Sequence, residues 1–387
     1  MSEKVLVTGG FGLVGSQTVR RLVAAGHRVV ATDLGTRDQR KAARSLPAGA
    51  EADWADLTDP NQVDRLVADT SPTVIIHLAA VIPPSIYRDA ALARRVNVDA
   101  TVALLRAAQS SQDRVRFIQA SSNAVHGARN PHRHPDLLRA DTPLRPTDLY
   151  GAHKAEVEGH VRGSGLDGVI LRLAGVLSVD LGAMPLNMDA PYLESALPTD
   201  GRIHTIDVRD AALAFAAATT ADVLGEILLV GGDESHLLRQ GDVGKALATA
   251  RGLVDVLPGG RPGDPDSDED WYVTDWMDTT RAQQALQFQR HPWPDMLAEM
   301  RAAAGWRRQP ARVISPLVRQ FLKRRAAYRD WPGIYADPWG AIRAEFGEPA
   351  RYTGARHDLV RASDPSTGVA HQLVCRRRHF GRNDCGF

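Results

Sequence analysis

The chain of 387 residues has little cysteine and no long hydrophobic run. Its two cysteines, Cys375 and Cys385, lie near the C-terminus, so no disulfide framework is expected; we do not expect them to bind metal with His379 either. No apolar segment reaches the roughly 18 residues that a membrane-spanning helix needs, and the opening MSEKVLVTGG lacks a signal-peptide pattern. The composition, 43% hydrophobic and 24% charged, is that of a globular protein. We expect a soluble, cytoplasmic protein without a membrane span.

Lysine is also scarce, and positive charge is unevenly distributed along the chain. Only five of the 47 basic residues are lysines, so a lysine in a motif position is less often accidental. Residues 305–387 carry a net charge of +9, whereas residues 1–304 carry −8. We therefore expect a basic extension to begin near residue 305.

The basic extension contains a helix signal. Ser315 is a suitable N-cap and Pro316 fits the first helical position, with apolar residues following at helical spacing. We favour a basic-faced helix that packs on its own domain or on a partner subunit, with a membrane-surface helix as an alternative. Nucleic acid is not an expected partner, because no reading motif accompanies the charge. The end from about residue 364 is expected to be disordered.

Short β-branched runs alternate with helical patterns through the first half of the chain. This alternation, with nearly continuous apolar strands, predicts an α/β fold in which helices cover both faces of a parallel sheet. The predicted strands are 4–8, 28–32, 73–78, 115–120, 169–173 and 226–230, and the predicted helices include 13–25, 97–108 and 208–219. A stretch rich in proline, glycine and aspartate, 258–270, is predicted to be a loop.

A glycine-rich run, TGGFGLVG, lies between the first predicted strand and the first predicted helix. Gly9, Gly12 and Gly15 permit a tight turn and the close approach of a pyrophosphate to the backbone. The free N–H groups and the dipole at the helix start would then bind this anion. The run therefore predicts a dinucleotide site.

Acidic residues follow the next strands, at the sheet edge where such folds bind ligands. Asp33 ends the second strand, where a carboxylate bonds the adenosine ribose hydroxyls and repels a 2′-phosphate, so NAD is favoured over NADP. Arg37 and Arg40 oppose this preference, but we expect them to be mobile. A further short strand, for which no limits are predicted, comes third along the chain and is followed by Asp56 and Leu57. The run HLAA at 77–80 ends the next strand, the fourth.

A serine, a tyrosine and a lysine form the candidate catalytic set. Tyr150 and Lys154 are four residues apart on a helical pattern, so they share one face. An ammonium held near a phenol favours the phenolate, so we expect Lys154 to lower the pKa of Tyr150 toward a useful range for acid–base catalysis. Ser122 ends the fifth strand and could orient a substrate oxygen. Together the three fit hydride transfer between a nicotinamide and an alcohol or carbonyl.

At this point the sequence resembles the extended short-chain dehydrogenase/reductases, also called NAD-dependent epimerase/dehydratases. The matching segments are TGGFGLVG at 8–15, HLAA at 77–80, NVDAT at 97–101, SSNAVHG at 121–127, YGAHK at 150–154, LRLAGV at 171–176, IHTIDVRDAA at 203–212 and GGRPGD at 259–264. The resemblance implies a Rossmann-type doubly wound sheet with a small C-terminal substrate lobe, and commonly a homodimer. It also implies that further residues line the NAD site, namely Leu13, Val14, Leu78, Ala79, Ala80, Asn97 and Ala174.

The resemblance suggests three parts. Residues 1–175 would form the NAD-binding domain, with 203–230 returning to it, and residues 176–304 would form the substrate lobe. Residues 305–387 would be the basic helical extension.

Departures from the family pattern narrow the reaction. Sugar dehydratases place an Asp-Glu pair after the hydroxyl residue, where this chain has Asn123 and Ala124. UDP-sugar epimerases carry an asparagine at the position of Gly175, and an arginine that reaches a diphosphate at the position of Asp200. The segment between the sixth strand and the IHTID run is also short. These differences disfavour dehydration and weaken the case for a nucleotide sugar.

Two residues are candidate substrate contacts. Arg261 belongs to the retained GRPGD run, and His126 replaces the tyrosine that is usual in this part of the family. For His126 we also consider a simple packing role in its loop. We predict an NAD-dependent oxidoreductase that acts on a small-molecule alcohol or carbonyl. The alternatives are a nucleotide-sugar 4-epimerase and a non-catalytic, regulatory NAD-binding protein.

Overall fold

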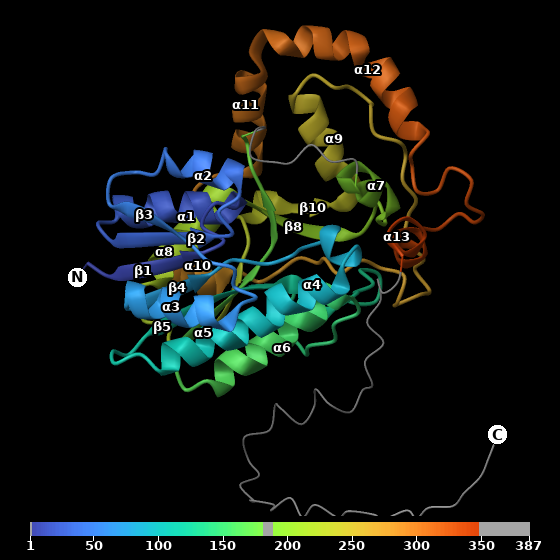
Figure 1. Cartoon of the computed structure of the whole chain (residues 1–387). Helices are drawn as coiled ribbons and strands as arrows, with labels where there is room; N and C mark the ends of the chain where they lie inside the picture. Colours follow the sequence, from blue (N-terminus) through green and yellow to red (C-terminus); the bar gives the residue numbers. More distant parts are fainter. Residues whose placement is uncertain (1, 181–188, 348–387) are drawn as a thin grey trace, which may run out of the picture. The chain divides into compact units, whose positions relative to one another are not determined.

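The computed structural model describes residues 2–180 and 189–347, and its main feature is a seven-stranded parallel sheet (Figure 1). The strand order is β3-β2-β1-β4-β5-β6-β9. The strands are β1 (Lys4–Thr8), β2 (Arg28–Asp33), β3 (Ala50–Trp54), β4 (Val74–His77), β5 (Arg116–Ser122), β6 (Asp167–Leu173) and β9 (Ile227–Val230). Because the chain moves outward from β1 to β3 and returns to β4 beside β1, the order reverses between β1 and β4. This is where doubly wound sheets bind their ligands.

Helices cover both faces of the sheet, because successive strand residues point to opposite sides. Val5 and Val7 belong to a core formed with α1 (Leu13–Ala24), α8 (Val208–Ala218) and α10 (Thr280–Leu286). Leu6, between them, belongs to the opposite core with α3 (Pro60–Thr70), α5 (Ala100–Gln109) and α6 (Leu149–Gly163). The predicted Rossmann-type fold is confirmed. The limits of the six strands predicted by range agree to within two residues, whereas β3 had no predicted limits.

Shorter elements connect these layers. They are α2 (Arg37–Ala43), η1 (Ser85–Tyr87), α4 (Ala90–Arg94), η2 (Arg95–Asp99) and η3 (Asn123–His126). The segment η2 is a π-helical turn that leads directly into α5, so the helix predicted from residue 97 begins earlier and less regularly.

A second, three-stranded sheet lies in the region of the expected substrate lobe, with the order β10-β8-β7. Its strands are β7 (Gly175–Leu177), β8 (Arg202–Asp207) and β10 (Leu237–Arg239). Nearby elements are α7 (Asp189–Ala196), η5 (Glu234–His236), α9 (Gln240–Ala250) and α11 (Trp293–Ala304). The segments after β8 return to the main sheet, since α8 contacts α1 and β9 pairs with β6. The three-part division of the chain stays a prediction.

The C-terminal part of the described chain differs from the sequence prediction. The turn η6 (Gly305–Arg307) leads into α12 (Arg308–Lys323), so the helix begins seven residues before the expected N-cap. Ser315 is buried within the helix, where its hydroxyl donates to the Ala311 carbonyl (2.9 Å) and accepts from the Val254 amide (3.1 Å). These contacts hold the turn that precedes Pro316, which lies inside the helix despite its missing N–H.

A large part of the apolar side of α12 is exposed rather than packed. Val313 is 79% exposed and Leu317 is 70% exposed, so these side chains do not make the domain contact that we favoured. A further helix, α13 (Pro338–Phe346), follows after a loop and is well buried. None of the described helices is both long and apolar enough to cross a bilayer. Cys375, Cys385 and the end expected to be disordered lie outside the described residues.

Candidate active site

The glycine-rich turn joins β1 to α1 at the switch point of the sheet. Gly9 has a φ of +64°, and a Cβ atom there would lie 2.8 Å from the Ala79 amide nitrogen. A Cβ atom at Gly15 would collide with the Gly9 carbonyl oxygen. Gly12 is the N-cap residue of α1, and no side chain caps this end of the helix. The turn thus brings Gly9, Gly12, Leu13, Val14 and Gly15 together as a cradle whose backbone N–H groups suit a phosphate.

The end of β4 is held against this turn by a buried histidine. His77 bonds to the Thr8 hydroxyl through Nδ1 (2.6 Å) and to the Thr101 hydroxyl through Nε2 (2.9 Å). Burial lowers the pKa of His77 to about 3, so the ring is neutral at pH 7. The Thr8 hydroxyl also accepts from the Leu78 amide (3.2 Å). This network fixes Leu78, Ala79 and Ala80 beside Gly9.

Asn97 supports the same edge from the opposite side. Its Oδ1 accepts from the Val81 amide (2.7 Å), and its Nδ2 donates to the Val81 carbonyl (2.9 Å). Asn97 therefore shapes the loop that follows the HLAA run. Ala174 is buried just after β6, where its amide donates to the Val230 carbonyl.

Asp33 lies at the end of β2 and is accompanied by a fixed arginine. Its Oδ1 accepts from the Leu34 amide (3.0 Å). Arg40, on α2, donates through Nε to the Gly35 carbonyl (2.8 Å), and its guanidinium lies 5.0 Å from the Trp54 ring centroid. The expectation that Arg40 is mobile was therefore wrong, because a ring and a carbonyl hold it. Arg37 is the first residue of α2.

Asp56 and Leu57 follow β3, as predicted. The Asp56 carboxylate accepts from both the amide and the hydroxyl of Thr58, which shapes the local turn. Leu57 is buried in the core on the α3 side of the sheet.

The structure brings Ser122, Tyr150 and Lys154 together at the ends of β5 and α6. Ser122 is close enough to Tyr150 to favour its phenolate form, and the Ser122 hydroxyl donates to the Asn123 side-chain oxygen (3.3 Å). The Lys154 ammonium donates to the Ala120 carbonyl (2.8 Å) and lies 5.7 Å from the centroid of the Tyr150 ring. These three side chains can therefore act on one substrate oxygen.

The electrostatics of Tyr150 differ from the prediction. Burial and the negative charge of Asp148 raise the pKa of Tyr150, and the proximity of Ser122 opposes them only in part. Burial also lowers the pKa of Lys154 to about 8, since an ammonium loses its hydration there. The expected lowering of the tyrosine pKa by Lys154 is not found, because the ammonium is directed to Ala120 and its own charge is disfavoured.

A buried carboxylate and two phenols adjoin Tyr150, and the sequence analysis missed all three. Asp148 caps α6 by accepting from the Gly151 amide (2.8 Å), and its other oxygen accepts from the Tyr87 hydroxyl (3.2 Å). Tyr87 also lies close enough to Tyr272 for each phenol to shift the pKa of the other. Burial raises the pKa of Asp148 to about 6. An aspartate just before a helical run is an N-cap signal that could have identified Asp148; nothing local marks the two tyrosines.

His126 is buried in an ionic network rather than directed to a substrate. Arg172 donates to His126 Nε2 (3.2 Å) and to the Ala140 carbonyl (2.9 Å), and it forms a bidentate pair with Glu158 (2.9 and 2.7 Å). Burial, followed by the positive charge of Arg172, lowers the pKa of His126 to about 4. The neutral ring thus accepts from Arg172, which is the packing role considered above.

Arg261 is likewise engaged by the protein itself. Its guanidinium donates to four backbone carbonyls, and it lies 4.6 Å from the centroid of the Tyr328 ring. The four acceptors belong to Tyr328, Trp331, Pro332 and Tyr335. The sequence analysis did not predict that backbone carbonyls of the C-terminal extension would accept hydrogen bonds from Arg261.

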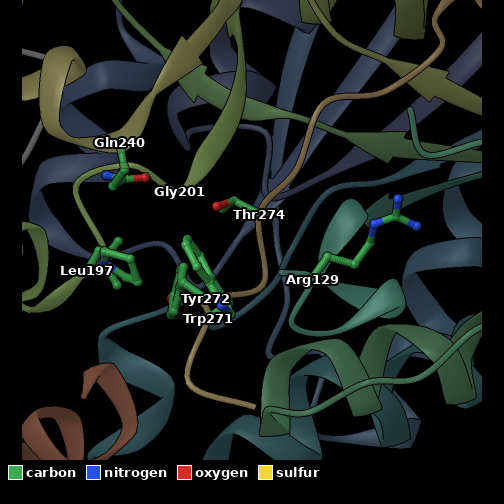
Figure 2. A pocket seen from close by; sticks show the side chains of 8 residues that line it. Arg129, Leu197, Gly201, Gln240, Trp271, Tyr272 and Thr274 are labelled. Carbon is green, nitrogen blue, oxygen red and sulfur yellow. The ribbon is translucent and has the colours of Figure 1, made fainter. Parts of the chain in front are cut away.

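A small pocket lies where the phenols meet the second sheet (Figure 2). Figure 2 shows Trp271 and Tyr272 side by side, with Thr274 and Gln240 nearby and Arg129 on the other side. The Oε1 atom of Gln240 is buried without a hydrogen-bond partner. Tyr272 therefore joins this polar pocket to the network around Asp148. No cluster of metal-ligating side chains occurs in the described ranges.

Residues 5–187 match the model of the NAD dependent epimerase/dehydratase family. This part of the chain belongs to that family. The match includes the glycine-rich turn, Asp33, Ser122, Tyr150 and Lys154, so the family assignment rests on the same segment that forms the candidate site.

Known relatives include both dehydrogenases and epimerases. The chain is 35% identical to D-erythronate dehydrogenase of Cupriavidus necator over 179 residues, which are 44% of this chain and 54% of that protein. It is 31% identical to UDP-glucose 4-epimerase of Azospirillum brasilense over 185 residues, or 46% and 51% of the two chains. The chain thus spans about half the length of these curated relatives. The structure of Thermus thermophilus UDP-glucose 4-epimerase with NAD has a similar fold, with a TM-score of 0.62 and 24% identity over 78% of this chain and 98% of that one.

Proposed function

We propose that this protein is an NAD-dependent oxidoreductase that transfers a hydride between NAD and an alcohol or carbonyl of a small molecule. The observation that carries the proposal is the convergence of Ser122, Tyr150 and Lys154 at the sheet edge that also holds the glycine cradle. A serine–tyrosine–lysine set beside a dinucleotide cradle serves this chemistry.

The residues present fit NAD. The cradle at Gly9 and Gly15 has no room for a side chain, which leaves its backbone open to a pyrophosphate. Asp33 would bond the adenosine ribose, while Asp56, Leu57, Leu78, Ala79, Ala80, Asn97 and Ala174 would line or support the rest of the site. Bound NAD would supply the hydride acceptor, and in its reduced form the donor.

Three side chains would bind the substrate oxygen and the cofactor and transfer the proton that accompanies the hydride. Because the pKa of Tyr150 is raised, its hydroxyl keeps its proton at pH 7 and can donate it to a carbonyl oxygen during reduction. During oxidation the phenolate of Tyr150 would instead take the proton of the alcohol, so this direction is favoured as the pH rises. Ser122, beside Tyr150, would orient the same oxygen. Lys154, with a pKa of about 8, is close to its titration point and would bind the nicotinamide ribose when it is charged.

A nucleotide-sugar 4-epimerase is the second candidate, because a UDP-glucose 4-epimerase is among the relatives and among the similar structures. An epimerase returns the hydride to its substrate, so NADH does not accumulate. A dehydrogenase releases NADH in proportion to product. We therefore propose incubating the purified chain with NAD and a panel of sugar acids, polyols and UDP-sugars, with NADH followed by absorbance. Net NADH formation on a non-nucleotide substrate supports our proposal, and epimerised UDP-sugar without NADH contradicts it.

A non-catalytic, regulatory NAD-binding protein is the least favoured alternative, since the catalytic set is complete. Such a protein would bind NAD and leave the whole panel unchanged. We further propose that the enzyme is cytoplasmic and works as a homodimer. Sedimentation equilibrium on the full chain tests the dimer, and a monomer at micromolar concentration would contradict it.

A further inference from the structure

We propose that the C-terminal segment 326–346 lines the substrate site and occupies the protein groups that would otherwise bind the nucleoside diphosphate of a nucleotide sugar. The substrate would then be an alcohol or carbonyl compound without a nucleoside diphosphate. This inference rests on the proposed oxidoreductase function, and it assigns a role to a segment that the sequence analysis left without one.

The first observation is the clamp at Arg261. A guanidinium has five N–H donors in a fixed fork, which suits a diphosphate. Here Nη1 donates to the carbonyls of Pro332 (3.0 Å) and Tyr335 (3.4 Å), and Nη2 donates to those of Trp331 (2.6 Å) and Tyr328 (3.4 Å). An anion could bind Arg261 in this way only by displacing the segment.

Two further arginines of this region, Arg129 and Arg202, are also engaged by protein acceptors. Arg129 pairs with the buried carboxylate of Asp275 (2.7 Å). Arg202 is 3.5 Å from the same carboxylate and donates to the carbonyls of His134 and Pro135 (3.1 Å each). Arg129, Arg202 and Arg261 thus all have protein partners, and a diphosphate would have to compete with those partners for each of the three.

The second observation is the anchoring of the segment along its length. The Tyr328 hydroxyl donates to the Ala196 carbonyl at the end of α7 (2.5 Å) and accepts from the Asp337 amide (2.8 Å). The Ala336 amide donates to the Pro262 carbonyl in the GRPGD loop (2.8 Å). Further along, Trp339 donates through Nε1 to the Glu269 carbonyl (3.0 Å). These bonds tie the segment to the end of α7 and, at two points, to the loop 258–270.

The third observation is that α13 packs against the catalytic neighbours. Trp339, Ile342 and Phe346 are buried in one apolar cluster with Ala124, and Tyr150 packs against this cluster. The ring centroids of Trp339 and Tyr272 are 5.6 Å apart, and those of Phe346 and Tyr87 are 6.2 Å apart. The helix therefore supports the two phenols that connect Asp148 to the pocket of Figure 2.

Together these contacts make the segment part of the site. It consumes the donors of the one arginine retained in the GRPGD run, and it replaces solvent beside Tyr272 with aromatic side chains. A substrate of limited size, without a charged nucleotide, therefore fits this surface better.

The test uses the full chain, with uridine diphosphate as the probe. Calorimetry on the NAD-loaded protein should detect no UDP binding in the micromolar range. Arg261→Ala should increase the rate of tryptic cleavage after Arg324, Arg325 or Arg329 by about tenfold, because lost hydrogen bonds release the segment. Its affinity for NAD should change less than twofold. Micromolar UDP binding that Arg261→Ala abolishes, with cleavage unchanged, would overturn the inference.

Two further variants guard the test. Arg239→Ala is a matched control, because Arg239 also donates to a carbonyl, that of Asp200 (2.6 Å), and also lies over a ring, that of Trp276. Its cleavage rate should equal that of the unmodified chain. Arg261→Lys keeps the positive charge but loses the forked guanidinium donors, so it should also accelerate tryptic cleavage. It serves as the test if the alanine variant does not fold. If the unmodified chain does not bind NAD, the proposed function is refuted, but the inference that segment 326–346 occupies Arg261 is not.

Discussion

Asp148 shows how one buried carboxylate can set the chemistry of its neighbours. It lies two residues before Tyr150, has no solvent exposure, and adds its negative charge to the burial that raises the pKa of the tyrosine. Burial also keeps the Asp148 pKa near 6, well above the usual value for aspartate. At pH 7 Asp148 is therefore mostly ionised, at a cost in burial that its usual pKa would not imply, and it lies beside a phenol that keeps its proton.

This arrangement predicts a pH-dependent stability. Because folding raises the Asp148 pKa from 3.8 to about 6, the group favours the folded state at low pH, and that contribution is lost as the pH rises from about 4 to about 6. Asp148→Asn keeps a side-chain oxygen for the cap but does not titrate. Relative to the unmodified chain, the variant should gain on the order of 1–3 kcal/mol of unfolding free energy between pH 4 and pH 7. Urea denaturation at both pH values measures this difference, and a constant difference would contradict it.

Asp33 gives a second prediction at this scale, on cofactor choice. Like charges about 4 Å apart repel by roughly 4 kcal/mol at an effective dielectric of about 20, so a 2′-phosphate is disfavoured beside Asp33. The fixed guanidinium of Arg40 attracts a 2′-phosphate, and so offsets the repulsion from Asp33, more than a mobile guanidinium would. We expect NAD to bind at least several-fold more tightly than NADP, with Asp33→Ala narrowing or inverting the ratio and Arg40→Ala widening it. Calorimetric titration of both cofactors decides the point, and tighter NADP binding by the unmodified chain would refute it.

At the scale of elements, the β1–α1 turn depends on backbone approach rather than on side chains. Gly9 combines a positive φ with close contact to the Ala79 backbone, so a methyl group there meets atoms that cannot move aside cheaply. Gly9→Ala should lower NAD affinity by at least about tenfold and destabilise the fold by roughly 1–3 kcal/mol.

Gly26→Ala separates the effect of a positive φ from the effect of close backbone contact. Gly26 also has a positive φ (+86°), but a Cβ atom there would meet nothing within 4 Å. This variant should show the backbone cost alone, with NAD affinity unchanged. Calorimetry and thermal melts measure NAD affinity and stability in both variants. Equal losses of NAD affinity would contradict the claim that the turn at Gly9 binds NAD.

The elements also show which features the sequence could predict. The strands of the main sheet and the turn at Gly9 follow from local patterns, because a buried parallel strand and a tight glycine turn leave a signature within a few residues. The start of α12 was misplaced because the bond between Ser315 and Val254 joins residues far apart in the chain. Proline inside a helix is disfavoured locally, so only tertiary contact could have indicated it.

At the scale of the whole molecule, the candidate site combines three distant parts of the chain. Ser122, Tyr150 and Lys154 were predicted together because each ends a strand or begins a helix of a regular fold. Tyr87 and Tyr272 were not, since 185 residues separate them and no motif marks either. The role of Arg261 was also hidden, because its partners lie about 70 residues further along in a segment without a local signature.

The account as a whole depends on hydride transfer at Tyr150, and one measurement tests it most directly. The rate of NADH formation should be compared between the unmodified chain and Tyr150→Phe, on the best substrate of the panel, with NAD affinity measured on both proteins. We predict that the variant loses a factor of about 10²–10⁴ in rate, as expected for removal of a general acid or base, while its affinity for NAD changes less than twofold. A variant that forms NADH as fast as the unmodified chain would contradict the account.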